Sequence, residues 1–127
     1  MKLENIHIES GKNTPEVIGD VKSNKLTIHG NSYPEDIKMF YKPIVSWLEK
    51  TSKYRDKICV DCQFYYISSS SVIATLKLLQ KVEALFEKVN IVFNWRYEIG
   101  DEDIKKIGQD FSNILENNMN IIEVAES

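Results

Sequence analysis

The sequence has few of the residues that build metal centres. Its 127 residues include two cysteines and two histidines, His7 and His29. Cys59 and Cys62 form a CxxC pair, but they lie inside KICVDCQFYY, which alternates like a strand. Their odd spacing therefore places them on opposite faces of that strand. A zinc site also requires further Cys or His ligands, which the neighbouring sequence does not offer. We expect no metal site, no redox pair and no cofactor.

Long apolar runs and an excess of basic charge are also absent. No run approaches the ~20 apolar residues of a membrane-spanning helix. The opening segment, MKLENIHIES, lacks the apolar stretch of a signal peptide. The 16 Lys and Arg residues are outnumbered by 19 Asp and Glu, which gives a net charge of −3, whereas nucleic-acid surfaces usually carry a basic face. We expect a cytoplasmic protein that inserts into no membrane and binds no nucleic acid.

Glycine is scarce where catalysis would need it. The chain has five glycines, and none flanks its serine run as in the G-x-S-x-G elbow of serine hydrolases. It also has no glycine-rich loop with a phosphate-binding lysine. These absences argue against a serine triad and against a nucleotide site, and we keep a small enzyme or ligand-binding domain as a third interpretation.

What the chain does contain is an ordinary globular composition. Hydrophobic residues make up 43% and charged residues 28%, which is typical of a folded domain. The length suits one domain, which we place at residues 1–127. Alternation and helical periodicity predict the order strand, hairpin, helix, strand, helix, strand, helix, strand. The expected ranges are residues 3–8, 16–30, 32–50, 57–66, 70–88, 89–97, 100–116 and 119–124.

Repeated strand-to-helix crossovers predict an α/β fold, in which a mixed β-sheet is covered by about three helices. We expect the strand at residues 57–66 to be central and covered on both faces. In the first helix, Ser32 and Glu35 have the spacing of a capping box, and Pro43 predicts a kink or a local break. Ile73 and Ile114 fall on helical stripes that we expect to be buried.

The segment that organises the chain is the serine run Ser68, Ser69, Ser70 and Ser71, which follows the strand and opens the next helix. In open α/β sheets, ligands and modified groups gather at the carboxyl ends of strands. A hydroxyl there can carry a phosphate, because helix N-terminal N–H groups favour negative charge. It can equally serve only as a helix cap while the other serines make the turn. The residues alone leave both interpretations open.

Several segments in the same order resemble one bacterial family, the SiaC-like regulatory phosphoproteins, which are similar in fold to STAS domains. The resemblance covers nearly the whole chain from Thr14 onward, and four motifs in the correct order make it fairly specific. It implies a single STAS-like domain. The segments that carry it are residues 14–17, 30–36, 65–70, 95–98, 100–103 and 108–111.

The resemblance also implies that the protein is a partner-switching module and not an enzyme. A Ser/Thr protein kinase phosphorylates one hydroxyl, and a type 2C protein phosphatase removes the phosphate. The unphosphorylated form binds and activates a diguanylate cyclase, which raises cyclic di-GMP and favours aggregation or biofilm. The phosphorylated hydroxyl of the family falls on Ser68, with Ser69, Ser70 and Ser71 as alternatives. The residues that the resemblance implies for partner binding are Tyr33, Pro34, Glu35, Tyr66, Ile67, Ser69 and Ser70.

The chain departs from the family at two positions near the serines. Ile67 stands where the family usually has Asn, and Val72 stands where it often has Lys. These departures allow a second interpretation, a constitutive STAS-like scaffold that binds its partner without phosphorylation.

Overall fold

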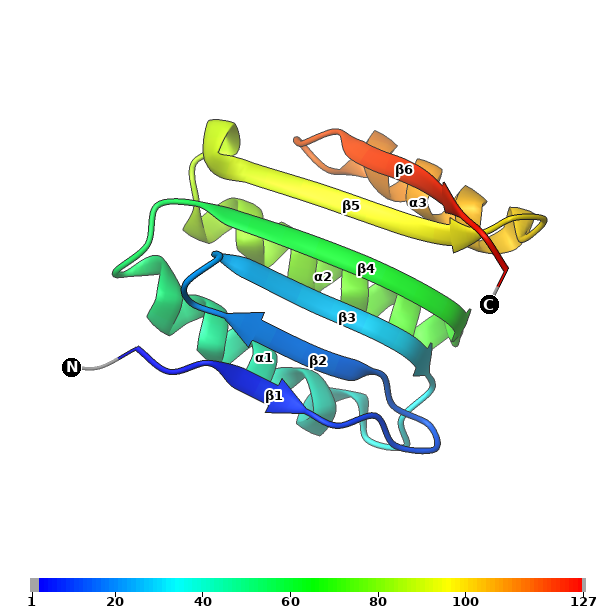
Figure 1. Ribbon diagram of the computed structural model, residues 1–127, viewed down its shortest axis with the longest axis horizontal. Coiled ribbons are helices and arrows are strands. Elements are labelled where there is room, and N and C mark those ends of the chain that lie inside the picture. Colours follow the sequence, from blue (N-terminus) through cyan, green and yellow to red (C-terminus); the bar gives the residue numbers. More distant parts are fainter. Residues whose placement is uncertain (1–2, 127) are drawn as a thin grey trace.

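The computed structural model describes residues 3–126, and it places one six-stranded sheet beside three α-helices (Figure 1). A single short 3₁₀ turn, η1, precedes the fifth strand in this part of the chain. The elements are β1 Ile6–Ile8, β2 Glu16–Asp20, β3 Lys25–Ser32, α1 Ile37–Ser52, β4 Ile58–Ile67, α2 Ser69–Leu85, η1 Lys88–Asn90, β5 Ile91–Glu98, α3 Glu102–Ile114 and β6 Met119–Val124.

The strands lie side by side in sequence order, β1-β2-β3-β4-β5-β6. The pairs β1–β2 and β2–β3 are antiparallel, and the three later pairs are parallel. Each helix connects two neighbouring parallel strands, and each connection advances in the same direction across the sheet. Because such crossovers are right-handed, all three helices lie on one face (Figure 1). The predicted α/β class, with a mixed sheet and three helices, is confirmed.

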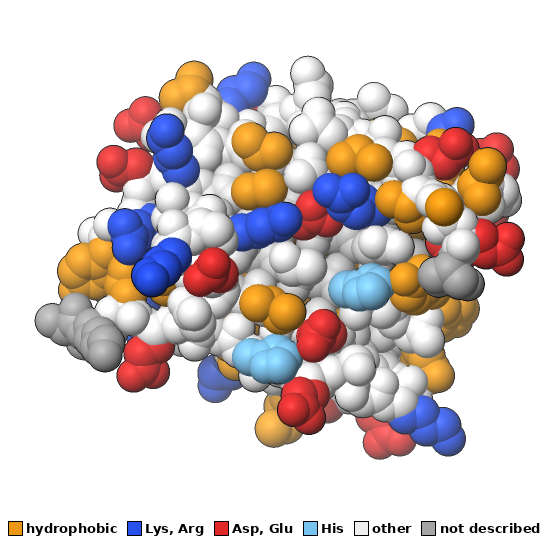
Figure 2. Space-filling view, viewed as in Figure 1, with side chains coloured by type: hydrophobic (Ala, Val, Ile, Leu, Met, Phe, Trp, Pro, Cys, Tyr) orange, Lys and Arg blue, Asp and Glu red, His pale blue; other side chains and the backbone are white. Residues whose placement is uncertain are grey.

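The other face of the sheet is open, so the prediction that β4 is covered on both faces is wrong. Cys59, Gln63 and Tyr65 point to this open face and are only half-buried. Figure 2 shows that histidines and side chains of both charges are interspersed over it. Cys59 and Tyr65 interrupt the polar side of the alternation in β4, as in a strand that is buried on both faces, but here they lie on an uncovered face.

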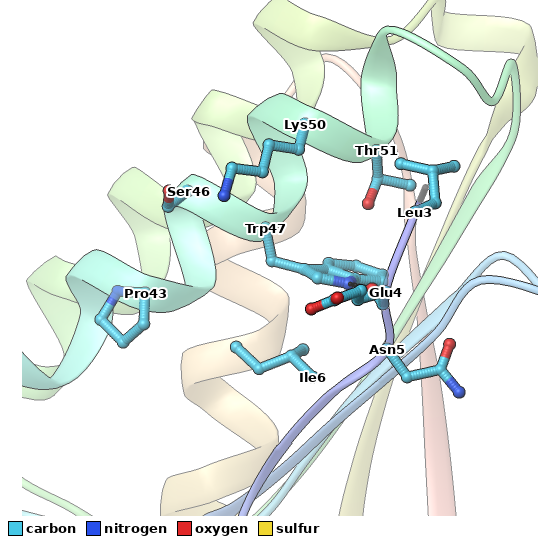
Figure 3. A pocket seen from close by; sticks show the side chains of 9 residues that line it. All are labelled: Leu3, Glu4, Asn5, Ile6, Pro43, Ser46, Trp47, Lys50 and Thr51. Atoms are coloured by element: carbon cyan, nitrogen blue, oxygen red, sulfur yellow. Dashed lines mark hydrogen bonds between the residues drawn. The ribbon is translucent and has the colours of Figure 1, made fainter. Parts of the chain in front are cut away.

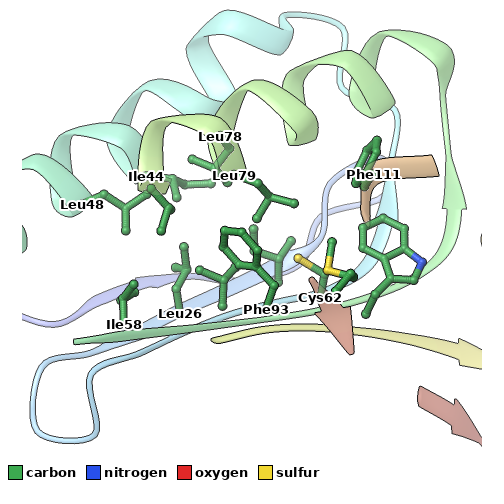
Figure 4. Packing of buried hydrophobic residues seen from close by; sticks show 14 of the residues in the cluster. Leu26, Ile44, Leu48, Ile58, Cys62, Leu78, Leu79, Phe93 and Phe111 are labelled. Atoms are coloured by element: carbon green, nitrogen blue, oxygen red, sulfur yellow. The ribbon is translucent and has the colours of Figure 1, made fainter. Parts of the chain in front are cut away.

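The hydrophobic core fills the space between the sheet and the helices (Figure 4). At its centre Trp95 is fully buried, with its ring 5.6 Å from that of Phe64 and 5.2 Å from that of Phe111. The indole Nε1–H of Trp95 donates to the carbonyl of Ile104 at 2.8 Å. Burying one such large side chain contributes about 1.5–3 kcal/mol, so these three rings fix α3 firmly against β4 and β5.

Helix α1 starts later than predicted, because Ser32 is not its cap. Ser32 is the last residue of β3, where the parallel ladder with β4 continues past a register shift at Gly30, and it is fully buried. Asp36 is the cap instead, and its carboxylate accepts from the backbone N–H of Met39 at 3.1 Å. The helix also runs through Pro43 without a break.

Two expected core residues lie outside the core. Ile73 on α2 is 56% exposed and Ile114 on α3 is 57% exposed. On α2, the buried stripe contains two hydroxyl residues, Ser71 and Thr75, together with Leu78, Leu79 and Val82. A hydrophobic pattern could not reveal this stripe, because part of it is polar.

Candidate partner-binding site

The junction between β4 and α2 is built around Ser68. Its backbone is extended, with φ −72° and ψ 161°, and its side-chain oxygen accepts from the N–H of Ser71 at 3.2 Å. Ser68 is therefore the N-cap of α2. The N–H groups of Ser69 and Ser70 belong to the first helical turn, which has no carbonyl partner for them inside the helix. The junction thus presents donors beside a hydroxyl.

The four serines differ in their access to solvent. Ser69 and Ser70 are exposed, Ser68 is half-buried, and Ser71 is completely buried. Solvent therefore reaches Ser68, Ser69 and Ser70 in this conformation, whereas Ser71 is shielded inside the protein.

A chain of hydroxyl groups leads from the junction into the protein. Ser71 Oγ accepts from Ser68 Oγ at 3.1 Å and from Ser32 Oγ at 2.9 Å. Ser32 also contacts the Tyr41 hydroxyl at 3.2 Å, and this hydroxyl lies 3.2 Å from Thr75 Oγ1. Burial raises the pKa of the Tyr41 hydroxyl, and its hydrogen bonds with Ser32 and Thr75 partly oppose that rise. The chain of hydroxyls therefore joins β3, α1 and α2 to the candidate phosphorylation site.

The parallel pairing of β3 and β4 gathers most of the residues that the sequence analysis assigned to partner binding. Ser32 lies opposite Ile67, and the N–H of Ser68 donates to the carbonyl of Ser32 at 2.9 Å. The segment that follows β3 therefore leaves the sheet beside the serines. The rings of Tyr33 and Tyr66 meet edge-to-face, with centroids 5.3 Å apart, and both side chains are exposed.

The other predicted partner-binding residues are placed less uniformly. Pro34 is half-buried, and Glu35, two residues after Tyr33, is exposed. Ile67 is buried in the core, so its side chain packs beneath the serine junction inside the protein. It therefore offers no surface to a partner. The candidate surface is therefore formed by the two tyrosines, Glu35 and the first serines.

The sequence analysis missed one segment of this surface, the loop between β1 and β2. The N–H of Tyr33 donates to the carbonyl of Asn13 at 2.8 Å, and the Tyr33 hydroxyl donates to the carbonyl of Lys12 at 3.4 Å. No local sequence signal links this loop to the serines, because the antiparallel pairing of β1, β2 and β3 is what brings them together.

A charged cluster on the open face was also missed. Asp61 is 5% exposed, and both its oxygens accept from Arg96, at 2.9 Å from Nε and 3.1 Å from Nη2. Asn94 donates to the same carboxylate at 3.4 Å. The hydrogen bond with Asp61 raises the pKa of Arg96, although partial burial opposes this. The cluster therefore neutralises and hydrogen-bonds a carboxylate that β4 places between its neighbouring strands.

The cysteines lie on opposite faces of β4, as their spacing predicted. Cys62 is buried and Cys59 is half-buried, and neither forms a disulfide. Burial raises the pKa of both thiols, which leaves little reactive thiolate. Within residues 3–126, no three His, Cys, Asp or Glu side chains cluster as metal ligands would.

A pocket of about 450 Å³ lies between residues 3–6, which lead into β1, and the C-terminal half of α1 (Figure 3). The indole ring of Trp47 forms one wall, and its Nε1–H donates to the carbonyl of Glu4 at 2.8 Å. Pro43 and Lys50 line the pocket along α1. The serine junction lies beside the opposite, N-terminal end of α1, so this pocket is separate from the candidate site.

Comparison with known proteins identifies the family. Residues 8–124 match the family described as SiaC family regulatory phosphoprotein. The chain therefore belongs to the SiaC family of regulatory phosphoproteins, as its resemblance indicated.

Individual relatives come from Pseudomonas aeruginosa. An uncharacterized protein of strain UCBPP-PA14 is 23% identical over 111 residues, which cover 86% of this chain and 88% of the relative. The crystal structure of apo-SiaC is 21% identical with a TM-score of 0.80, and it covers 94% of this chain and 98% of that one. SiaC in complex with the diguanylate cyclase SiaD is 21% identical with a TM-score of 0.86, and the coverage is 94% and 99%.

At this level of identity the structural matches establish the fold, and they agree with the family match. In the part of the chain that the structure describes, no helix is both long enough and apolar enough to cross a bilayer.

Proposed function

We propose that this protein is a phosphorylation-controlled binding module that activates a diguanylate cyclase and thereby raises cyclic di-GMP. The family match supports a regulatory role. The solved relative SiaC is described as the activator of the cyclase SiaD in their complex. In this proposal the protein acts in the cytoplasm by binding and catalyses no reaction. A Ser/Thr kinase and a type 2C phosphatase set its state.

The observation that carries the proposal is the position of Ser68. It is a half-buried hydroxyl at the carboxyl end of a central strand, directly before α2 and beside the exposed pair Tyr33 and Tyr66. In the unphosphorylated form this surface combines aromatic rings with neutral hydroxyls. Such a surface can be buried against a partner at small electrostatic cost.

Phosphorylation would change that cost sharply. A phosphoserine carries about −1.5 to −2 charge at pH 7, and burying an ionised group without a partner costs more than a surface contact returns. The phosphorylated protein itself stays folded, because the first turn of α2 has unpaired N–H groups and no acidic residue to repel the phosphate. Partner binding is then lost without refolding.

A pair of substitutions at Ser68 separates charge from capping. Asp and Asn both cap helices well, so Ser68→Asp and Ser68→Asn differ mainly in charge. We expect Ser68→Asp to weaken binding to a diguanylate cyclase of the same organism by at least about tenfold, or about 1.4 kcal/mol. Ser68→Asn should bind nearly as the native protein does. Calorimetric titration measures both.

Two outcomes would contradict the proposal. Equal cyclase affinity of Ser68→Asp and Ser68→Asn would favour the constitutive scaffold that Ile67 and Val72 allow. Phosphopeptide mass spectrometry after co-expression with the kinase provides the second check, and phosphate found only outside Ser68 to Ser71 would refute the assigned site. Turnover of a substrate by the purified protein would instead favour an enzyme.

A further inference from the structure

A groove of about 520 Å³ runs between α1 and α2 and ends at Ser70, two residues from the proposed phosphorylation site. The two helices pack side by side on the covered face of the sheet (Figure 1). The groove is therefore lined by the surfaces of both helices and is continuous with the junction.

The walls of this groove are apolar. Ile73 contributes a side chain that is 56% exposed. Ile37 and Val45 on α1 and Ala74 on α2 are only partly buried. Ile73 has the helical spacing of the buried residues of α2, but its side chain is not part of the core. A partner that covers the groove would remove this apolar surface from water, which stabilises a complex by roughly 25 cal/mol per Å².

The rim of the groove is basic, although the whole chain has a net charge of −3. Three lysines line it, Lys38 on α1 and Lys77 and Lys81 on α2, and no carboxylate does. Lys81 contacts Glu49 at 3.3 Å. Among the described residues, Lys38 and Lys77 form no salt bridge. Charge complementarity therefore favours an acidic occupant.

The length of the groove suits a helix. Ser70 and Lys81 are separated by eleven residues of α2, which corresponds to about 16 Å at about 1.5 Å per residue. A partner helix of about three turns has the same length. Helices that lie in grooves present an apolar stripe to the groove and polar residues to its rim.

We propose that the groove binds an amphipathic helix of the partner, with Asp and Glu residues flanking its apolar stripe. This inference rests on the proposed function, because the helix belongs to the protein that the switch controls. It also gives the switch a direct mechanism. A phosphate on Ser68 stands at one end of the groove and repels an acidic helix that enters it.

Two synthetic peptides test the groove without knowledge of the partner. Both are 18-residue amphipathic helices with the same leucine stripe, and the flanking positions are Glu in one and Lys in the other. Fluorescence anisotropy with the full chain should show that the Glu peptide binds at least about tenfold tighter. Equal affinity for the two peptides, tighter binding of the Lys peptide, or binding of neither, would overturn the proposal.

Three variants locate the binding. Lys77→Glu should abolish the preference for the Glu peptide, and Ile73→Asn should weaken both peptides. Lys57→Glu makes the same charge change in an exposed loop, so its peptide affinities should match those of the native chain. The proposal fails if Lys77→Glu and Lys57→Glu behave alike. It also fails if sedimentation shows a homodimer that Ile73→Asn dissociates, because the occupant is then a second copy of this chain.

Cyclase binding separates this inference from the proposed function. If Lys77→Glu loses the cyclase while Ser68→Asp retains it, the groove stands and the phosphate switch fails. If Ser68→Asp loses the cyclase while Lys77→Glu retains it, the switch stands and the groove proposal fails.

Discussion

At the scale of single residues, Ser68 is both the N-cap of α2 and the site at which we propose phosphorylation. Its oxygen accepts from the N–H of Ser71, and its hydroxyl donates to Ser71 Oγ. A phosphate ester keeps an acceptor at this position but loses the donated proton. Capping of α2 can therefore persist in the phosphorylated form, while the hydrogen bond that Ser68 donates to Ser71 Oγ is lost. The two interpretations of the serine run are thus compatible.

Gly108 shows how one residue fixes a helix on the core. A Cβ at this position would lie 2.7 Å from Trp95 Cγ and 2.8 Å from Trp95 Nε1, and the indole ring cannot move away because it is fully buried. We expect Gly108→Ala to lower the free energy of unfolding by about 1–3 kcal/mol, the usual cost of overpacking. Urea denaturation measures this. The adjacent exposed residue provides a control, since Gln109→Ala should change the stability little, and equal stability of the two variants would contradict the packing argument.

At the scale of elements, the buried hydroxyl chain joins three segments, β3, α1 and α2, in addition to the hydrophobic core that they share. Tyr41 on α1 contacts both Ser32 at the end of β3 and Thr75 on α2. These three residues are all buried. Since buried polar groups are costly without partners, the chain of hydroxyls specifies how α1 and α2 lie beside the junction.

Removing the Tyr41 hydroxyl should therefore loosen this arrangement. Tyr41→Phe leaves the hydroxyls of Ser32 and Thr75 with one partner fewer, and we expect a loss of about 1–2 kcal/mol in the free energy of unfolding. Tyr54 is exposed, so Tyr54→Phe serves as the matched control with little expected effect. Thermal unfolding of both variants is the measurement. A Tyr41→Phe protein as stable as its control would show that the hydroxyl chain contributes nothing to stability.

The same elements show what the sequence can predict. The order of strands and helices was predictable because alternation and helical periodicity are local properties. The start of α1 was not predictable in this way, because the parallel ladder with β4 extends β3 through Ser32. The buried face of α2 was not predictable either. Ser71 and Thr75 can be buried there because partners on other elements satisfy their hydroxyls. The clustering of Tyr33 with Tyr66 required the parallel pairing of β3 and β4.

At the scale of the whole molecule, the main feature is the difference between the two faces of the sheet. Parallel strands are usually covered on both faces, yet here three helices cover one face only (Figure 1). The open face therefore carries polar groups that satisfy one another, such as the Asp61–Arg96 pair, beside exposed apolar side chains such as Ile18 and Val92. Cys62 and Tyr41 lie on the covered side as buried groups that can lose a proton.

These buried groups predict how stability depends on pH. Burial raises the pKa of Cys62 and of Tyr41, so the folded protein keeps protons that the unfolded chain loses. Their contribution is complete below about pH 8.5 and declines as the pH rises, by up to about 1.4 kcal/mol per pH unit for each group. Urea denaturation between pH 8 and pH 10.5 should show this decline. Cys62→Ala should reduce the slope above pH 9, and an unchanged slope would contradict the assignment.

The most direct test of the central claim is the affinity of the stoichiometrically phosphorylated protein for the diguanylate cyclase. The phosphate is first located on Ser68 by mass spectrometry, and circular dichroism confirms that the fold is retained. We expect the phosphorylated protein to bind at least about a hundredfold more weakly than the unphosphorylated one, about 2.7 kcal/mol, with an unchanged spectrum. Equal affinities of the two forms would contradict the account.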